Sequence, residues 1–246
     1  MSYSATIIIP VFNNWKYTEK CLQYLYKLGD DYQIIIVNNG SKDKTASILK
    51  TMQQELFNDN LVVINSEKNL GFSRGNNLGY QYAEGEVVIF LNNDIEVTGS
   101  FEHWPDPLII EAKKGKIVCT KGGQLDKNFD FVREGCGLVR DKYWYMSGWC
   151  IAAQKTTFDQ LIQNHCYDIN SDKIVNKKAT GPWNEKFFLY YEDGDLTWRA
   201  QGLNIPITEI SMTNVRHIGR ATGKRYNAFV FLKKSKRIFD KIWKGR

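Results

Sequence analysis

The sequence has few of the features that mark specialised protein classes. Its 246 residues include only 5 Pro and an ordinary 19 Gly, and 43% of them are hydrophobic, which excludes collagen-like, mucin-like and disordered chains. The longest apolar runs, around residues 5–12 and 86–91, are far shorter than the ~20 residues of a membrane-spanning helix. The first residues lack the basic and apolar stretches of a secretory signal. These absences predict a cytoplasmic protein with one large domain, or one domain with an appendage.

Cysteine and histidine are also scarce. The chain has 5 Cys, an odd number with no CxxC spacing, and 3 His. These counts argue against a disulfide framework, a cysteine-rich zinc site and a multi-histidine site. We expect reduced and mostly packed thiols at Cys21, Cys119, Cys136, Cys150 and Cys166.

Positive charge is concentrated at one end of the chain. The formal net charge is +6, and residues 233–246 hold seven Lys or Arg against one Asp, so the rest of the chain is nearly neutral. This distribution argues against a nucleic-acid groove spread over the fold. It predicts a basic amphipathic helix within residues 223–246. That helix either contacts an anionic membrane surface reversibly or docks on the rest of the chain.

Apolar, β-branched runs alternate with helical periods through the first half. Unbroken apolar runs predict parallel strands buried on both faces, over residues 5–11, 33–37, 61–65 and 86–91. Helices are expected between them, over residues 15–28, from Ser41 or Asp43 to about 56, and up to about 83. The fold class is therefore α/β, with a mostly parallel sheet flanked by helices.

The polar turns that follow these strands are expected to meet. In open α/β sheets, ligands bind beyond the carboxyl ends of the strands. The turns at residues 13–14, 38–39 and 92–94 would then converge on one edge. The second half is less regular, with strands expected at 116–120 and 131–139, a short helix at 158–163 and a loop at 168–178.

Asp94 follows the fourth predicted strand and is the first candidate for chemistry. A carboxylate at that position can hold Mg²⁺ or Mn²⁺, which prefer oxygen ligands and share them with substrate phosphates. It can equally cap a turn. His217 is a candidate second ligand for the same ion, or a structural residue.

Three carboxylates lie within four residues, at Glu192, Asp193 and Asp195, directly after the apolar and aromatic run 187–191. Like charges this close raise each other's pKa and suit a general base. The alternative is the acidic first turn of a helix, where carboxylates face the positive end of the helix dipole. Asp195 would then begin a helix whose first turns cover residues 196–200.

Five segments resemble, in order, the motifs of the family 2 glycosyltransferases, in particular a rhamnosyltransferase-like subgroup that builds surface polysaccharides. Residues 7–13 are similar to the opening strand, and residues 36–41 to the second strand with its nucleoside-contacting turn. Residues 69–79 resemble the Asn-x-Gly-Phe loop, residues 91–94 stand where the Asp-x-Asp motif lies, and residues 181–196 resemble the segment with the catalytic base.

This resemblance implies a GT-A fold. Residues 1–222 would form one catalytic domain, with a nucleotide-sugar-binding half at 1–98 and an acceptor-binding and catalytic half at 99–222. The enzyme would move a sugar from a dTDP- or UDP-linked donor to a hydroxyl of a saccharide or lipid-linked glycan, in polysaccharide or glycan synthesis. It would invert the anomeric centre and use Mg²⁺ or Mn²⁺.

The matching motifs also imply roles for individual residues. Asp193 would be the general base, with Glu192 as the alternative, and Asp94 and His217 would hold the metal. The acceptor would contact Gly148, Trp149, Tyr190 and Tyr191, although Trp149 suits core packing equally well. Arg74 would reach a phosphate or lie in solvent. The residues expected around the donor are Pro10, Val11, Phe12, Asn13, Asn38, Asn39, Gly40, Asn69, Gly71, Arg74, Asn76, Asn92 and Asn93.

Three positions depart from the family pattern. Asn38 stands where the family usually has an Asp that accepts from the base imide N–H; the Asn carbonyl oxygen can still accept, without the charge. Asn92 takes the first place of the Asp-x-Asp motif, so metal binding would depend on Asp94, the donor diphosphate, water and His217. Residues 182–183 are Pro-Trp where the family often has Gly-Phe-Asp.

Two other functions fit parts of the sequence. A sugar-phosphate nucleotidyltransferase would carry a glycine-rich phosphate loop after the first strand, and residues 10–14 contain no glycine. A non-catalytic nucleotide-sugar or glycan-binding module would not need the adjacent carboxylates of Glu192 and Asp193.

Overall fold

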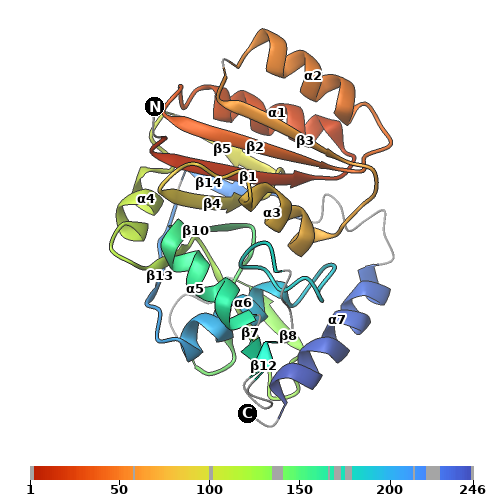
Figure 1. Ribbon diagram of the computed structural model, residues 1–246, viewed down its shortest axis with the longest axis vertical. Helices are drawn as coiled ribbons and strands as arrows, with labels where there is room; N and C mark the ends of the chain where they lie inside the picture. The colour runs from red at the N-terminus through yellow and green to blue at the C-terminus, as the bar shows by residue number, and fades with distance from the viewer. Residues whose placement is uncertain are drawn as a thin grey trace.

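The computed structural model describes residues 3–57, 59–99, 102–134, 141–165, 167–168, 173–174, 179–212, 214–219 and 228–244. Its centre is a seven-stranded sheet of order β13-β6-β10-β4-β1-β2-β3 (Figure 1). These strands are β1 (Ala5–Val11), β2 (Tyr32–Asn39), β3 (Leu61–Ser66), β4 (Val87–Leu91), β6 (Ile117–Cys119), β10 (Cys150–Gln154) and β13 (Ile207–Glu209).

The sheet is mostly parallel. β1 pairs in parallel with β2 and β4, and β2 with β3. Among the described strands of this seven-stranded sheet, only β10 is antiparallel to its neighbours, β4 and β6. β6, β10 and β13 come from the second half of the chain, so residues on both sides of position 98 share one sheet.

Helices cover both faces of this sheet. α1 (Trp15–Tyr26), α2 (Thr45–Glu55) and α4 (Asp106–Ala112) pack on the face that holds Ile7 and Ile9. α3 (Phe72–Tyr80), α5 (Lys155–His165) and α6 (Glu192–Gly202) pack on the face that holds Ile8. Because successive strand residues point to opposite faces, a continuous apolar run fills both cores, as expected for parallel strands.

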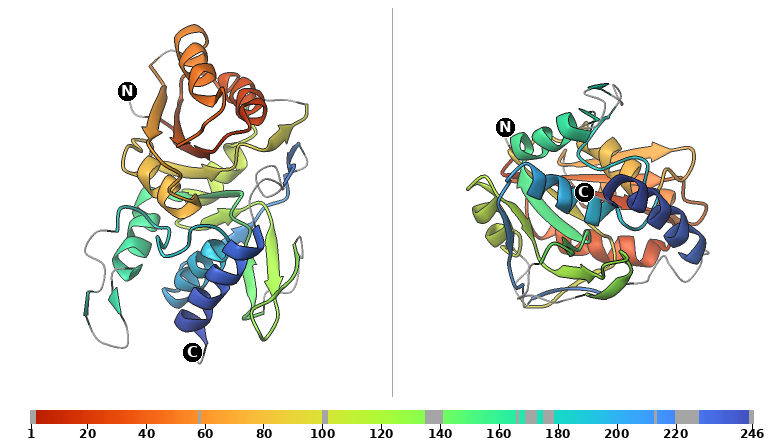
Figure 2. Two further views of the ribbon diagram at one scale, coloured as in Figure 1. Left: turned by 90° about the vertical axis from the view of Figure 1, so that its right-hand side faces the viewer. Right: turned by 90° about the horizontal axis from the view of Figure 1, so that it is seen from below.

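Smaller elements extend the second half. β5 (Ile95–Val97) pairs with β14 (Val215–His217), β7 (Gly122–Leu125) lies between β8 (Phe131–Glu134) and β9 (Trp144–Met146), and β11 (Tyr167–Asp168) pairs with β12 (Lys173–Ile174). α7 (Ala228–Trp243) lies along α6 and the β7–β8–β9 sheet (Figure 2). A third apolar cluster joins these elements through Phe129, Tyr191 and Phe239. No helix in the described ranges is both long and apolar enough to span a membrane.

Most predicted elements of the first half are confirmed within a few residues. The second half differs more. β10 was not predicted, the helix expected at 158–163 is the longer α5, and α6 begins at Glu192 rather than at Asp195. The expected strand at 131–139 is described only as β8, and most of the expected loop at 168–178 lies outside the described residues. The packed-thiol prediction is confirmed for Cys21, Cys119 and Cys150, which are buried thiols outside any disulfide; Cys136 and Cys166 lie outside the described residues.

Candidate active site

The polar turns at the carboxyl edge of the sheet converge as predicted. Asn13 N donates to Ser41 Oγ at 2.8 Å, and Lys42 N donates to Asn13 Oδ1 at 2.8 Å, so the turns after β1 and β2 are joined. The turn after β4 is joined to α1, because Asn93 Nδ2 donates to Thr18 Oγ1 at 3.0 Å. Asn13 has a left-handed backbone with φ of 55°, which an Asn tolerates better than most residues.

Asn38 retains acceptor capacity on its amide oxygen. The side chain is 5% exposed, its Nδ2 donates to Asn65 Oδ1 at 2.9 Å, and its Oδ1 accepts from Ser41 N at 3.2 Å. An amide oxygen has two lone pairs, so one remains for a ligand. The partners fix the orientation of the amide at the carboxyl end of β2.

Asn39 and Asn69 hold the following glycine loop together. Asn39 Oδ1 accepts from Leu70 N at 2.8 Å, and its Nδ2 donates to Gly71 O at 3.0 Å. Asn69 Oδ1 accepts from Gly71 N at 2.9 Å. Gly71 has φ of +82°, and a Cβ there would lie 2.5 Å from Phe188 O, so only glycine permits this close approach. Both polar side-chain atoms of Asn39 are therefore hydrogen-bonded to the backbone of this loop.

The other residues expected around the donor differ in accessibility. Val11 is 1% exposed and belongs to the core, whereas Pro10 and Phe12 are partly exposed. Gly40 has φ of +73° and a Cβ there would lie 2.5 Å from Lys68 C, so this turn also requires glycine.

Asn76 and Arg74 occupy opposite environments on α3. Asn76 is fully buried; its Nδ2 donates to Phe72 O at 3.1 Å, and its Oδ1 has no partner among the described atoms. The Arg74 side chain is 57% exposed, with its Nε 3.6 Å from Glu185 Oε2. Arg74 was expected either to reach a phosphate or to lie in solvent, and its position matches the second expectation.

Asp94 and His217 form a compact polar corner at the end of β4. His217 Nε2 lies 2.9 Å from Asp94 Oδ1 and 3.1 Å from Asn92 Nδ2. The His217 ring stacks on Trp149, with centroids 5.3 Å apart and an interplanar angle of 3°. The side chain of Asp94 is 8% exposed and that of His217 is 23% exposed, so the corner opens to solvent on the histidine side.

The β5–β14 ladder brings this distant pair together. His217 faces Ile95 in the antiparallel register, and Ile218 N donates to Asp94 O at 2.8 Å. Arg216 and Glu96, which also face each other, form an ion pair on the same ladder. Backbone pairing therefore fixes the histidine beside the aspartate although they lie far apart in the sequence.

The corner suits a hard divalent cation. Mg²⁺ binds ligands at about 2.0–2.1 Å in near-octahedral geometry, which separates adjacent ligand atoms by about 3 Å. Asp94 Oδ1 and His217 Nε2 lie 2.9 Å apart, a hydrogen-bond distance that is also compatible with that separation. No group of three or more His, Cys, Asp or Glu able to hold a metal occurs among the described residues, so substrate or water oxygens would complete the shell.

Asp193 lies at the start of α6 and is held by backbone donors. Its Oδ2 accepts from Gly148 N at 3.3 Å, and its Oδ1 accepts from Gly194 N at 2.9 Å. A Cβ at Gly148 would lie 3.3 Å from Asp193 Cβ, so the two backbones are closely packed. Asp193 is partly exposed, and a carboxylate that is both oriented and accessible can accept a proton from a bound hydroxyl.

Glu192 is chemically similar and differently placed. It is 6% exposed, and its Oε2 has no partner among the described atoms. Burial, and to a lesser extent the nearby Asp193 charge, raise the pKa of Glu192 well above its ordinary value. The sequence analysis attributed raised pKa values to the like charges alone, whereas burial is the larger cause at Glu192. The alternative of an acidic first helical turn holds, because α6 begins at Glu192.

The aromatic residues expected at the acceptor are mostly packed. Trp149 is 5% exposed and one face of its ring meets His217, which fits core packing. Tyr191 is 2% exposed and its hydroxyl donates to Phe129 O at 2.7 Å, so its ring is not available to stack on a sugar and the expectation is corrected. Tyr190 is partly exposed and keeps the acceptor role as a prediction.

The sequence analysis missed the partners of several supporting residues. Asp195 is 1% exposed and pairs with Arg199 Nε at 2.8 Å, and their i, i+4 spacing on a helix is a signal that would have found them. Asn77 is fully buried, accepts from Trp183 N at 3.0 Å and donates to Trp183 O at 2.8 Å. Nothing in the sequence around Asn77 on α3 indicates that its partner lies 106 residues away.

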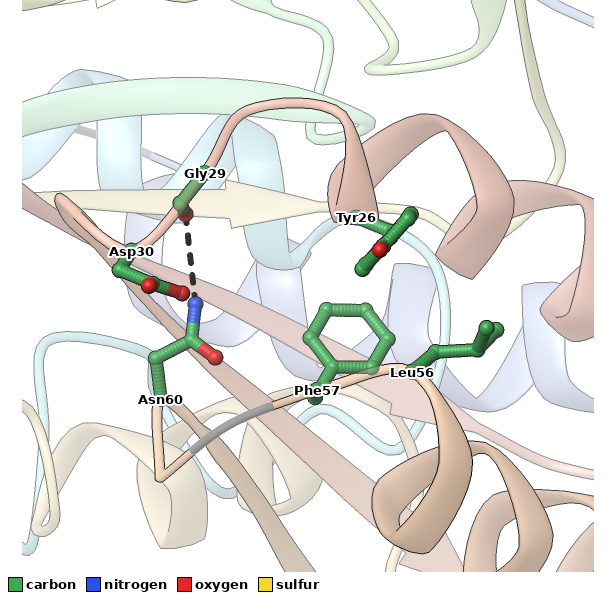
Figure 3. A pocket seen from close by; sticks show the side chains of 6 residues that line it. All are labelled: Tyr26, Gly29, Asp30, Leu56, Phe57 and Asn60. Carbon is green, nitrogen blue, oxygen red and sulfur yellow. Dashed lines mark hydrogen bonds between the residues drawn. The ribbon is translucent and has the colours of Figure 1, made fainter.

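A small hollow lies elsewhere, before β2 and β3, and so at the opposite ends of these strands. It has a cavity volume of about 220 Å³ and is lined by Tyr26, Gly29, Asp30, Leu56, Phe57 and Asn60 (Figure 3). Asn60 Nδ2 donates to Gly29 O at 3.3 Å, which ties the two turns together. The convergent polar turns, rather than this hollow, therefore define the candidate site.

Comparison with known proteins gives one family. The model of "Glycosyl transferase family 2" matches residues 6–120. "Minor teichoic acid biosynthesis protein GgaB" of Bacillus subtilis (strain 168) is 31% identical over 106 residues, covering 42% of this chain and 12% of that protein. "Glycosyltransferase GlyG" of Streptococcus pneumoniae serotype 4 is 28% identical over 96 residues, covering 38% of this chain and 31% of that protein. The matched segments thus span less than a third of either relative.

Solved structures confirm the GT-A fold. S. aureus TarS 1-349 in complex with UDP superposes with a TM-score of 0.57 at 20% identity, covering 87% of this chain and 59% of that one. GalNAc-T7 with UDP, GalNAc and Mn²⁺ superposes with a TM-score of 0.68 at 16% identity, covering 89% of this chain and 44% of that one. At these identities the likeness concerns the fold.

The buried Glu192 predicts a distinctive pH dependence of stability. Because its pKa is higher in the folded protein than in the unfolded chain, the native state holds the proton more tightly and loses stability as pH rises above the unfolded value. Glu192→Gln removes this loss, so its free energy of unfolding should gain on that of the wild type by up to roughly 1.4 kcal/mol per pH unit. Urea denaturation between pH 5 and 8 measures the difference, with the exposed Glu55→Gln as control. A difference that stays constant with pH would contradict the buried, protonated state.

Proposed function

Because the model of glycosyl transferase family 2 matches residues 6–120, we propose that this chain transfers a sugar from a nucleoside-diphosphate donor to a saccharide hydroxyl, with inversion at the anomeric carbon. The observation that carries the proposal is that two adjacent residues, Gly148 and Trp149, contact both Asp193 and the polar corner formed by Asp94 and His217. Gly148 N holds Asp193, and the ring of Trp149 stacks on His217 beside Asp94. A proton acceptor and a cation corner are thereby linked at one edge of the sheet.

The donor proposed is uridine- or thymidine-linked. The TarS and GalNAc-T7 structures both contain UDP, which supports a diphosphate-linked donor for a chain of the same fold. The free lone pair on Asn38 Oδ1 is suited to accept the imide N–H that uracil and thymine share. Asn13 and Gly40, in the joined turns beside Asn38, would flank the base and ribose.

Asp193 would act on the acceptor hydroxyl. Its carboxylate takes the hydroxyl proton while the acceptor oxygen forms a bond to the anomeric carbon and the bond from that carbon to the diphosphate breaks. Attack on the face opposite the leaving diphosphate inverts the configuration. Backbone donors from Gly148 and Gly194 keep the carboxylate oriented without neutralising it, which suits a general base.

Asp94 and His217 would hold Mg²⁺ or Mn²⁺. When bound, such an ion neutralises charge on the departing diphosphate. The Mn²⁺ in the GalNAc-T7 structure and the 2.9 Å ligand spacing support this assignment. Asn92 Nδ2 lies 3.1 Å from the same Nε2, so this contact would have to open for that nitrogen to bind the ion.

The acceptor proposed is a saccharide or lipid-linked glycan, in polysaccharide or glycan synthesis. The relative GgaB carries teichoic acid biosynthesis in its name, which supports a surface-polymer setting for this chain. Gly148 and Tyr190 are the partly exposed residues beside Asp193 where an acceptor would bind.

The base assignment predicts opposite behaviour for neighbouring carboxyls. Asp193→Asn should lower turnover by ~10²–10⁴-fold with donor affinity kept within a few-fold, because it removes a proton acceptor at nearly constant volume. Glu192→Gln should keep most of the activity, because that carboxyl is buried and out of reach of an acceptor hydroxyl. Hydrolysis of a panel of UDP- and dTDP-linked sugars with Mn²⁺ measures both. Near-normal turnover by Asp193→Asn, with loss in Glu192→Gln, would reverse the assignment.

The metal assignment predicts a graded response. EDTA should stop turnover, and Mg²⁺ or Mn²⁺ should restore it, because charge on the leaving diphosphate would otherwise go uncompensated. Asp94→Ala should not be rescued at ordinary metal concentrations, whereas His217→Ala should raise the Mn²⁺ concentration needed for half-maximal activity. Full activity in EDTA would rule out the metal.

A reversible contact with anionic membranes is also proposed, through one face of α7. Its apolar side is committed to the domain, since Phe239 is fully buried and Trp243 packs on Trp198. The exposed side carries only bases and two apolar residues: Phe229, Val230, Lys233, Lys234, Arg237, Lys241 and Lys244. The contact would therefore be electrostatic, with apolar anchoring confined to the first turn.

Charge removal on that face tests the membrane contact. Replacing Lys234, Arg237 and Lys241 with Gln should abolish low-salt co-sedimentation with anionic vesicles, because each base near such a surface contributes about 1 kcal/mol. The matched control replaces the exposed Lys16, Lys27 and Lys50 on the α1–α2 side. If the wild type stays in the supernatant at low salt, or if both variants sediment equally, α7 is not a membrane contact.

A further inference from the structure

The segment that leads into α6, the helix that carries Asp193, has an unfavourable backbone conformation. Tyr190 and Tyr191 have φ of 72° and 67°, so two consecutive aromatic residues adopt the left-handed conformation directly before Glu192. Such a conformation costs free energy for a bulky residue and persists only where surrounding contacts impose it. The contacts that hold this segment therefore matter for the position of Asp193.

Many of those contacts come from one helix, α7. Ser235, which is 2% exposed, donates its Oγ proton to Leu189 O at 2.7 Å, immediately before the strained pair. The ring of Phe231 stacks on Phe188, with centroids 4.7 Å apart and an interplanar angle of 16°. α7 thus binds the segment on its amino-terminal side.

The same helix also holds the other side of Asp193. A Cβ on Gly194 would lie 3.1 Å from Phe239 Cε2, so the fully buried Phe239 ring packs directly under the first turn of α6. Trp243 Nε1 donates to Asp195 Oδ1 at 3.1 Å, while Arg199 Nε holds the other oxygen of that carboxylate at 2.8 Å. Figure 2 shows α7 lying alongside α6 over this region.

We propose that α7 is a positioning element for the reaction, in which Ser235 and Trp243 hold residues 189–195 in the strained conformation that presents Asp193 to the acceptor. Ser235 donates to the backbone carbonyl of Leu189, and Trp243 donates to the carboxylate of Asp195, which is ion-paired with Arg199. Both act through the backbone that carries the base. This proposal rests on the function proposed for Asp193.

Two conservative variants remove one hydrogen bond each. Ser235→Ala deletes the hydroxyl, and Trp243→Phe deletes the N–H donor while keeping an aromatic ring against Trp198. Ser47→Ala is the matched control, because Ser47 Oγ also donates to a backbone carbonyl, that of Lys44 at 2.8 Å, but on the exposed surface of α2. A thermal melt of each variant shows whether the global fold is kept.

The kinetic readout separates positioning from stability. With the donor that is hydrolysed fastest in the presence of Mn²⁺, each variant should lose kcat by roughly 10- to 100-fold, the effect of a small displacement of a catalytic group, with donor KM unchanged. Ser47→Ala should change neither. Unchanged kcat in folded Ser235→Ala and Trp243→Phe, or a rise in KM that accounts for the whole loss, would overturn the proposal.

Amide hydrogen exchange provides a test that does not need activity. Peptides covering residues 187–195 should exchange faster in both variants than in the wild type, while peptides from β1 and β2 keep their rates. If the wild type hydrolyses no donor, the proposed function fails and the exchange data still decide whether α7 holds the segment. Equal exchange of residues 187–195 in the wild type and both variants would overturn the positioning role in either case.

Discussion

Parallel strands leave their carboxyl ends at one edge of a sheet, and the candidate site is built on this constraint. β1, β2 and β4 are adjacent and run in the same direction, so the turns that follow them lie side by side at one edge. Asn13, Asn38 and Asp94 are the polar residues at those positions. The helical crossovers bury both faces of the sheet, and the polar side chains gather at this edge.

The second half of the chain completes the edge with antiparallel pairs. β10 enters beside β4, and the residues just before it, Gly148 and Trp149, therefore arrive next to Asn92, whose N–H donates to Trp149 O at 2.8 Å. β14 pairs with β5 and delivers His217 to Asp94. The first pairing places the backbone N–H of Gly148 that donates to Asp193, and the second places the His217 side chain beside Asp94.

The first half and its converging turns could be predicted from the sequence, because local patterns determine them. Unbroken apolar strands such as 5–11 and turn residues such as Asn13 carry their signal within a few positions. The rest depends on partners far away. The segment Cys150–Gln154 is short and combines apolar and polar residues, so its sequence does not predict a central strand. The sequence near Tyr191 likewise does not predict that Phe129 and Phe239 pack around it. The sequence analysis placed Asp94 and His217 at one site, and the β5–β14 ladder is the reason that they lie close together.

Glu192 and Asp193 illustrate how position separates two nearly identical groups. Successive residues of an α-helix point about 100° apart, since 3.6 residues complete a turn. At the start of α6 this rotation turns Glu192 into the protein, where its carboxyl loses water, and leaves Asp193 at the boundary with solvent, where Gly148 and Gly194 donate to it. Burial, and to a lesser extent the nearby charge of Asp193, raise the pKa of the Glu192 carboxyl. Two adjacent carboxyls in one helical turn are thereby given different environments, and only the accessible one is placed to meet an acceptor hydroxyl.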